Sequence, residues 1–200
     1  MATDIEAVLR NIESCYDFTG KSVIHVGAGG GQFVRYAGRA HKVLGVDPDP
    51  AAVERLKQTI REQGLESRFS ALRGDLLTVT ARADVVFLEF CLHEIVDPRA
   101  ALRRARTLAP ETLVVDPAVD SRWAWYLCET EKAQRGWAAV ERFPLALDRT
   151  FPGVQRFRDH AELLAKVGVL GECVIRRVRD FEGRQDFSID MPYRVALLAG

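Results

Sequence analysis

The chain of 200 residues has no long apolar run, no excess of charge of one sign and no closely spaced cysteines. A membrane-spanning helix needs about 20 consecutive apolar residues, and nothing after Met1 resembles the basic and apolar segments of a secretory signal. Lysine plus arginine and aspartate plus glutamate both number 28, so the net charge is zero. No overall field therefore attracts nucleic acid or an anionic membrane, and we expect a cytoplasmic protein with neither partner.

The cysteines are few and lie far apart in the sequence. They are Cys15, Cys91, Cys128 and Cys173, and no pair has the CxxC or CxH spacing of metal and redox sites. We expect free, mostly buried thiols in a reducing compartment. The sequence predicts no metal site.

Nothing in the sequence divides the chain into parts. It contains no internal repeat, low-complexity tract or long flexible linker, and its 48% hydrophobic and 28% charged residues are typical of soluble globular domains. A chain of this length buries roughly 70% of its unfolded surface when it folds. We expect residues 1–200 to form a single domain.

Strand and helix patterns alternate through the first 115 residues. Short apolar runs predict strands, and apolar residues at three- and four-residue spacing predict helices. The expected strands are 22–26, 41–46, 68–73, 83–90 and 112–115, and the expected helices are 4–14, 32–40, 50–63 and 98–108. Buried strands joined by helices predict an α/β fold in three layers, a doubly wound parallel sheet covered on both faces.

The last third of the chain lacks this regular alternation of strand and helix patterns. We expect no strand between 116 and 153, and a helical insertion at about 119–150 that acts as a lid or an acceptor pocket. Asp159 and Glu162 have the spacing of a capping box. Residues 172–180 and 193–198 then read as two strands of an antiparallel hairpin.

The most informative segment is 23–31, VIHVGAGGG, which follows a strand and precedes a helix. Its glycines allow a sharp turn and close approach of a ligand, and the free N–H groups of a following helix favour an anion. The dinucleotide fingerprint requires a third small residue at position 32, where the chain has Gln32. A tight turn that packs a helix and binds nothing is the alternative interpretation.

Two aspartates follow neighbouring predicted strands. Asp47 lies 20 residues after Gly27, where an acidic side chain can accept hydrogen bonds from a ribose, and Asp75 follows the next strand. Open parallel sheets bind ligands outside the carboxyl ends of their strands, so we expect one shared crevice. Each aspartate alone could equally be a solvated loop residue or a helix cap.

Four segments in this order resemble the class I S-adenosylmethionine-dependent methyltransferases. They are 23–31, Gly45–Val46–Asp47–Pro48, Gly74–Asp75–Leu76 and the segment 89–98, EFCLHEIVDP. The resemblance covers residues 19–115 and extends more loosely to the C-terminus. It implies a seven-stranded, mostly parallel sheet with a C-terminal antiparallel hairpin, and S-adenosylmethionine as cofactor.

The resemblance also implies a role for individual residues. Gly27, Ala28, Gly29 and Gly31 face the methionine part, Asp47 and Pro48 the ribose, Gly74, Asp75 and Leu76 the adenine, and Glu89 and Phe90 the sulfonium. The family usually carries an acid two positions before the first glycine, near the ammonium group of the ligand, but this chain has His25. A neutral histidine supplies no countercharge, although His25 could equally be an ordinary strand residue.

Methyl transfer needs mainly alignment of the reacting atoms. A base is needed only when the acceptor atom arrives protonated, and His93 is the candidate, with helix-edge packing as the alternative. The predicted acceptor side comprises His93, Glu94, Trp123, Tyr126 and Trp137. The aromatic residues among these could instead bury a helix against the domain.

The sequence therefore predicts transfer of a methyl group from S-adenosylmethionine to a small-molecule acceptor at an O, N, S or C atom. The segment 89–94 lacks the Asn-Pro-Pro-Tyr type of motif that goes with planar nitrogens in nucleic acid and protein. An NAD-dependent oxidoreductase is the alternative enzyme, against which Gln32 and Asp75 argue. A non-catalytic binding protein of the same fold is the other alternative, which His25 leaves open.

Overall fold

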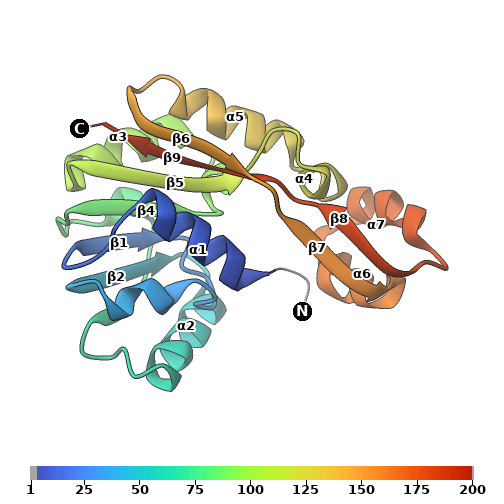
Figure 1. The fold of residues 1–200 in the computed structure, drawn as a ribbon, viewed down its shortest axis with the longest axis horizontal. Coiled ribbons are helices and arrows are strands. Elements are labelled where there is room, and N and C mark those ends of the chain that lie inside the picture. The colour runs from blue at the N-terminus through green and yellow to red at the C-terminus, as the bar shows by residue number, and fades with distance from the viewer. Residues whose placement is uncertain (1–3, 200) are drawn as a thin grey trace.

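The computed structural model describes residues 4–199. Its strands are β1 (Ser22–Val26), β2 (Lys42–Asp47), β3 (Phe69–Arg73), β4 (Val85–Glu89), β5 (Glu111–Pro117), β6 (Leu145–Phe151), β7 (Val154–Asp159), β8 (Gln185–Asp190) and β9 (Tyr193–Leu198). Seven of them form a sheet in the order β3-β2-β1-β4-β5-β9-β6, and β7 pairs with β8 (Figure 1). Strands β1 to β5 are parallel, and β9 is antiparallel to both neighbours. The predicted α/β fold is confirmed.

The helices are α1 (Ile5–Cys15), α2 (Pro50–Glu62), α3 (Pro98–Leu108), α4 (Arg122–Tyr126), α5 (Thr130–Val140), α6 (His160–Val167) and α7 (Glu172–Val178). Three predicted caps are present: the side chains of Asp49, Asp97 and Asp159 accept hydrogen bonds from the first turns of α2, α3 and α6. These caps satisfy backbone N–H groups that have no partner within the helix. The predicted helix 32–40 is only a 3-10 turn at Val34–Gly38.

The core lies on both faces of the main sheet. Alternate side chains of β4 show this: Val85 and Phe87 pack with α1 and α2 on one face, whereas Val86 and Leu88 pack with α3 and α5 on the other. All four side chains are inaccessible to solvent. The sheet is thus the middle layer of three, as the continuous apolar strands predict.

The last third of the chain corrects the sequence prediction. Residues 145–151 form the edge strand β6, where no strand is expected, so the insertion at 119–150 is helical only in its first part. Residues 172–178 form helix α7 rather than a strand, because Val174 and Val178 pack from one helical face. The antiparallel hairpin exists, but its strands are β7 and β8.

Two strands leave the main sheet and carry a lobe. Strand β6 continues into β7 after residues 152–153, and β8 continues into β9 after 191–192, so β7 and β8 extend beyond the sheet (Figure 1). We call β7, β8, α4, α6 and α7 the lobe. It has a core of its own, which includes Trp123, Phe157, Leu163, Val174 and Phe181.

A disulfide ties two parts of the lobe together. Cys128, between α4 and α5, is bonded to Cys173 in α7, with 6.6 Å between their Cα atoms. The expectation of four free thiols is therefore wrong: Cys15 and Cys91 are free, and the other two are paired. The inference of a reducing compartment depended on free thiols, so the disulfide removes that support. In the described part of the chain, no helix combines the length and the apolarity needed to span a membrane.

We expect the disulfide to stabilise the lobe. The bond closes a loop of 45 residues, and restricting such a loop in the unfolded chain contributes about 2 to 4 kcal/mol. The double variant Cys128→Ser/Cys173→Ser should lose this free energy of unfolding, measured by urea denaturation without reductant. Cys15→Ser is the matched control and should change little. Equal stability of the double variant and the control would contradict the prediction.

Candidate active site

The glycine turn after β1 owes much of its composition to packing. Gly27 and Gly31 have φ values of +74° and +82°, which other residues rarely adopt. A Cβ atom at Gly27 would lie 2.4 Å from Cβ of Cys91, and one at Gly31 would lie 3.0 Å from Cβ of Thr59. At Gly29 the nearest atom would be 3.7 Å away. A Cβ atom at Gly29 would therefore make only an ordinary contact, whereas packing excludes one at Gly27 and crowds one at Gly31.

Asp47 connects the turns that follow β1, β2 and β3. Its carboxylate accepts hydrogen bonds from the backbone N–H of Gly29 at 3.0 Å and of Asp49 at 2.9 Å, and its carbonyl oxygen accepts one from Gly74 at 3.1 Å. A carboxylate can accept about four hydrogen bonds, so Asp47 retains capacity for a ligand.

Other predicted cofactor residues lie around this point in different environments. The carboxylate of Asp75 is exposed and caps the 3-10 turn at Leu76–Thr78. Leu76 itself is buried against α3, and Ala28 is buried on the opposite face, so these two side chains belong to the core. Pro48 is exposed at the turn.

Glu89 is a buried carboxylate at the end of β4. Its Oε2 lies 3.2 Å from Nε2 of His25, and Nδ1 of that ring lies 3.1 Å from the hydroxyl of Tyr36. An ionised carboxylate only accepts hydrogen bonds, so Nε2 carries the proton and the Tyr36 hydroxyl donates to Nδ1. Burial raises the pKa of Glu89, and the hydrogen bond from His25 opposes that rise. Sequence reasoning expects no countercharge at position 25, but His25 holds a carboxylate on the adjacent strand.

A cavity of about 260 Å³ lies between the carboxyl end of the sheet and the lobe. Its sheet side includes Glu89, Phe90 and His93, and its lobe side includes Trp123 and Lys166. Four of the predicted site residues, Glu89, Phe90, His93 and Trp123, therefore meet at one cavity. Phe90 has a φ of +45°, an uncommon conformation that the hydrogen bond from its N–H to Val115 holds at the cavity wall.

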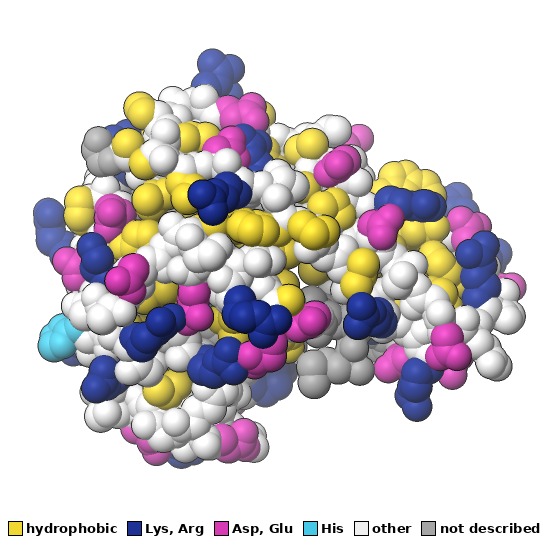
Figure 2. Space-filling model, in the orientation of Figure 1, with side chains coloured by type: hydrophobic (Ala, Val, Ile, Leu, Met, Phe, Trp, Pro, Cys, Tyr) yellow, Lys and Arg dark blue, Asp and Glu magenta, His cyan; other side chains and the backbone are white. Residues whose placement is uncertain are grey.

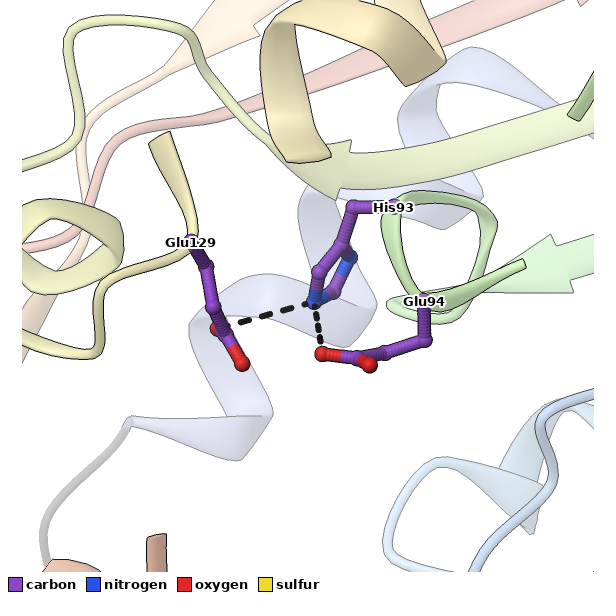
Figure 3. Close-up of side chains that lie close together, drawn as sticks. All are labelled: His93, Glu94 and Glu129. Atoms are coloured by element: carbon purple, nitrogen blue, oxygen red, sulfur yellow. Dashed lines mark ion pairs between the residues drawn. The ribbon is translucent and has the colours of Figure 1, made fainter. Parts of the chain in front are cut away.

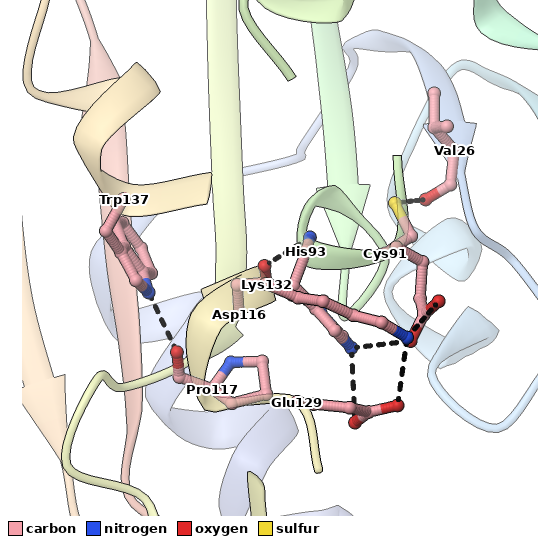
Figure 4. A network of polar contacts seen from close by, with 9 residues as sticks. Val26, Cys91, His93, Asp116, Pro117, Glu129, Lys132 and Trp137 are labelled. Carbon is pink, nitrogen blue, oxygen red and sulfur yellow. Dashed lines mark hydrogen bonds and ion pairs between the residues drawn. The ribbon is translucent and has the colours of Figure 1, made fainter. Parts of the chain in front are cut away.

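His93 is fixed by a buried aspartate. Asp116, in β5, accepts hydrogen bonds from the backbone N–H of His93 at 2.8 Å and from Nδ1 of its ring at 2.7 Å (Figure 4). Burial alone would lower the pKa of His93, but the hydrogen bond and charge of Asp116 raise it. Sequence reasoning missed Asp116, whose only signal is an acid at the end of the apolar strand TLVVDP.

Two glutamates face the other ring nitrogen of His93. Nε2 lies 3.5 Å from Oε1 of Glu94 and 3.7 Å from Oε2 of Glu129 (Figure 3). Donor atoms of the three residues lie within 4.8 Å of one another, a spacing that could hold a metal ion. However, the ammonium group of Lys132 lies 3.0 Å from both carboxylate oxygens of Glu94 and 3.7 Å from Glu129. This lysine already supplies the positive charge that the cluster needs.

Two predicted acceptor residues lie away from the cavity, which corrects that part of the prediction. Trp137 is buried in the core on the α3 face, where its Nε1 donates to the carbonyl oxygen of Pro117 at 2.8 Å. Tyr126 packs in the core of the lobe, with its ring centre 5.0 Å from that of Phe181. Both aromatic residues therefore have the structural role that sequence reasoning kept as the alternative.

The electrostatics of the glutamate pair predict a pH dependence of stability. Burial, together with a hydrogen bond to Glu94, raises the pKa of Glu129 to about 7, against about 4.3 in an unfolded chain. Between these values the folded state binds a proton that the unfolded state has lost, so the free energy of unfolding falls as pH rises. Glu129→Gln removes this loss and should gain stability relative to the parent protein from about pH 5 to pH 8, measured by urea denaturation.

Glu131 provides the control for this measurement, because it is exposed on the same helix. Glu131→Gln should follow the parent protein across the whole pH series. If both variants show the same pH dependence, Glu129 does not titrate as we predict.

Comparison with known proteins finds a domain family that matches part of the chain. The methyltransferase domain family matches residues 24–115. A protein from Bacillus halodurans C-125, provisionally named as a methyltransferase, superposes with a TM-score of 0.71 at 16% identity, over 96% of this chain and 98% of that one. No curated protein matches the chain.

Two further solved structures share the fold. An S-adenosylmethionine-dependent methyltransferase from Aquifex aeolicus has a TM-score of 0.59 at 17% identity, over 99% of this chain and 91% of that one. The magnesium protoporphyrin IX methyltransferase of Synechocystis, solved with bound S-adenosylhomocysteine, has a TM-score of 0.59 at 13% identity, over 96% and 80%. Residues 24–115 therefore match the methyltransferase domain family, and the chain shares its fold with S-adenosylmethionine-dependent methyltransferases.

Proposed function

We propose that this protein transfers a methyl group from S-adenosylmethionine to a small molecule bound in the cavity between the sheet and the lobe. The observation that carries the proposal is the carboxylate of Glu89. It is buried in the cavity wall beside the glycine turn, and among the described residues only one of its two oxygens has a hydrogen-bond partner. A buried carboxylate of this kind favours a cation, and the methionine part of the cofactor carries an ammonium group.

The cofactor would be held by residues on adjacent strand ends. Asp47 has free acceptor capacity for the ribose hydroxyls, the lack of a side chain at Gly29 lets the ligand approach the backbone, and Glu89 pairs with the ammonium group. His25 is a positioning residue, since it orients Glu89 without reaching the cavity itself. The bound cofactor supplies an electrophilic methyl group on a sulfonium.

His93 would accept the proton of the acceptor. Because Nδ1 donates to Asp116, the neutral ring presents Nε2 as the basic atom. Nε2 lies toward the cavity, between Glu94 and Glu129. A hydroxyl, thiol or amine acceptor loses its proton as the new bond to carbon forms, and a fixed imidazole with a raised pKa is suited to take that proton.

The size and charge of the protein support a small acceptor. The cavity of about 260 Å³ is slightly smaller than the roughly 300 to 1,000 Å³ of typical small-molecule sites, so a large acceptor would not fit. Figure 2 shows basic and acidic side chains interspersed over the drawn face, in keeping with a net charge of zero. A polyanionic acceptor such as nucleic acid is normally bound by a basic stripe.

Binding of S-adenosylhomocysteine tests the cofactor site. At about 100 times its Kd this ligand should stabilise the protein by about 2.7 kcal/mol, seen as a rise in Tm, and NAD should not. Asp47→Asn should lower the affinity for S-adenosylhomocysteine by about tenfold or more, because hydrogen bonds to a charged group are worth about 1.5 to 3 kcal/mol. Asp49→Asn, an exposed cap that asparagine also fills, should bind normally. Stabilisation by NAD alone would overturn the proposal.

A truncated ligand isolates the role of Glu89. Glu89→Gln keeps an oxygen that can accept a hydrogen bond from His25 but loses the negative charge. The variant should therefore bind S-adenosylhomocysteine about tenfold or more weakly than the parent protein. 5′-Methylthioadenosine lacks the amino-acid part and should bind the variant and the parent protein equally, as measured by calorimetry. If both ligands lose affinity to the same extent, Glu89 does not recognise the ammonium group.

A further inference from the structure

The lobe places a lysine at the cavity. Lys166, in α6, lines the cavity, and its Nζ donates a hydrogen bond to Oε1 of Gln155 at 2.9 Å. The same ammonium group lies 5.5 Å from the ring centre of Trp123, another cavity residue. The lysine is therefore held in one position by two neighbours on the cavity wall.

Lys166 has no anionic partner in the part of the chain that the structure describes. Lys21, Lys57 and Lys132 each form an ion pair with a glutamate, but no carboxylate lies within 4 Å of the Lys166 ammonium group. Lys166 is exposed, yet partial burial lowers its pKa, and the charge of Glu162 opposes that effect. An anion bound beside the ammonium group would further favour its charged form.

Gln155 holds the ammonium group of Lys166 in position. Its side chain is 4% exposed. Its amide oxygen accepts from Lys166, and among the described residues its amide nitrogen has only the sulfur of Met191 as a partner, at 2.8 Å. Sulfur is a weak acceptor, whereas lysine has only donors to offer. The lysine therefore determines which way the buried amide points, and the amide holds the ammonium group at the cavity.

The acidic and basic side chains lie on different sides of the cavity. Glu89 and Glu129 line the side of His93, and among the described lining residues Lys166 is the lysine on the lobe side. A single ammonium group balances the one negative charge of a carboxylate, whereas a phosphate group carries about −1.5 to −2. The face of Trp123 beside it offers a surface for a planar apolar group.

We propose that the methyl acceptor is a small carboxylic acid whose carboxylate pairs with Lys166, while a separate hydroxyl or amine of the same molecule faces His93. This inference rests on the proposed function, because it concerns the acceptor of that reaction. In the transfer, the acceptor atom forms its bond to the methyl carbon as the bond from carbon to sulfur breaks. The electron pair of that bond stays on sulfur, and the acceptor proton passes to Nε2 of His93. The carboxylate at Lys166 takes no part in these steps and only positions the molecule.

Matched acids and amides test the proposal by binding rather than by turnover. The protein is first saturated with S-adenosylhomocysteine, and calorimetry then compares 4-hydroxybenzoate with 4-hydroxybenzamide, and 3-(4-hydroxyphenyl)propanoate with its amide. The acids should bind the parent protein at least about tenfold more tightly than the amides, because only they form a charge-assisted hydrogen bond. Lys166→Met keeps the apolar stem and should reduce this ratio to about one.

Two further variants complete the design. Lys166→Glu should reverse the preference, so that the amide of each pair binds more tightly than the acid. Lys42→Met, an exposed lysine at the start of β2, should keep the ratio of the parent protein. The inference is overturned if Lys166→Met keeps the preference for acids, or if neither acid binds the saturated protein at about 10 mM. Failure of S-adenosylhomocysteine itself to bind would instead count against the proposed function.

Discussion

Buried carboxylates at the carboxyl ends of neighbouring strands are the constraint on which the site depends. Asp47 and Glu89 are the last residues of β2 and β4, and Asp116 is the last but one of β5; each is at most 9% exposed. An ionised carboxylate without partners is very costly in such surroundings, and burial raises the pKa of both Glu89 and Asp116. The chain supplies a donor for each: a backbone N–H for Asp47, His25 for Glu89 and His93 for Asp116. These hydrogen bonds are therefore needed for the stability of the fold, and they also position the polar groups of the site.

The lobe turns the crevice at the strand ends of the sheet into a cavity. A parallel sheet offers ligands a crevice only outside its strand ends, and that crevice becomes a cavity here because β6 and β9 continue past the sheet as β7 and β8. The lobe core and the disulfide between Cys128 and Cys173 fix α4, α6 and α7 above the strand ends. Cys128 directly precedes Glu129 in sequence, so the same covalent bond that stabilises the lobe also holds a cavity residue in place.

The sequence predicts the first 115 residues well because their signals are local. Apolar runs, the caps at Asp49 and Asp97, and the glycine turn each need only a few adjacent residues to be recognised. The last third lacks such signals: edge strand β6 is half polar, and Val174 and Val178 fit a short strand as readily as one face of a helix. Four site residues are predicted and meet at the cavity. The pairing of His93 with Asp116, and the presence of Lys166, depend on contacts between distant segments and leave no pattern in the sequence.

The glycine-rich turn carries less evidence for a ligand than its sequence suggests. Gly27 is required by contact with Cys91 and Gly31 by contact with Thr59, so a protein of this fold that bound nothing would need both. At Gly29 and Gly30 a Cβ atom would make only ordinary contacts, with nearest atoms at 3.7 and 3.5 Å, which permits a ligand without demanding one. Glu89 carries more evidence, because it is a largely buried carboxylate in the cavity wall with one oxygen that has no hydrogen-bond partner among the described residues. Unpaired polar atoms facing a cavity therefore distinguish a binding site from a packing motif, where a glycine pattern alone does not.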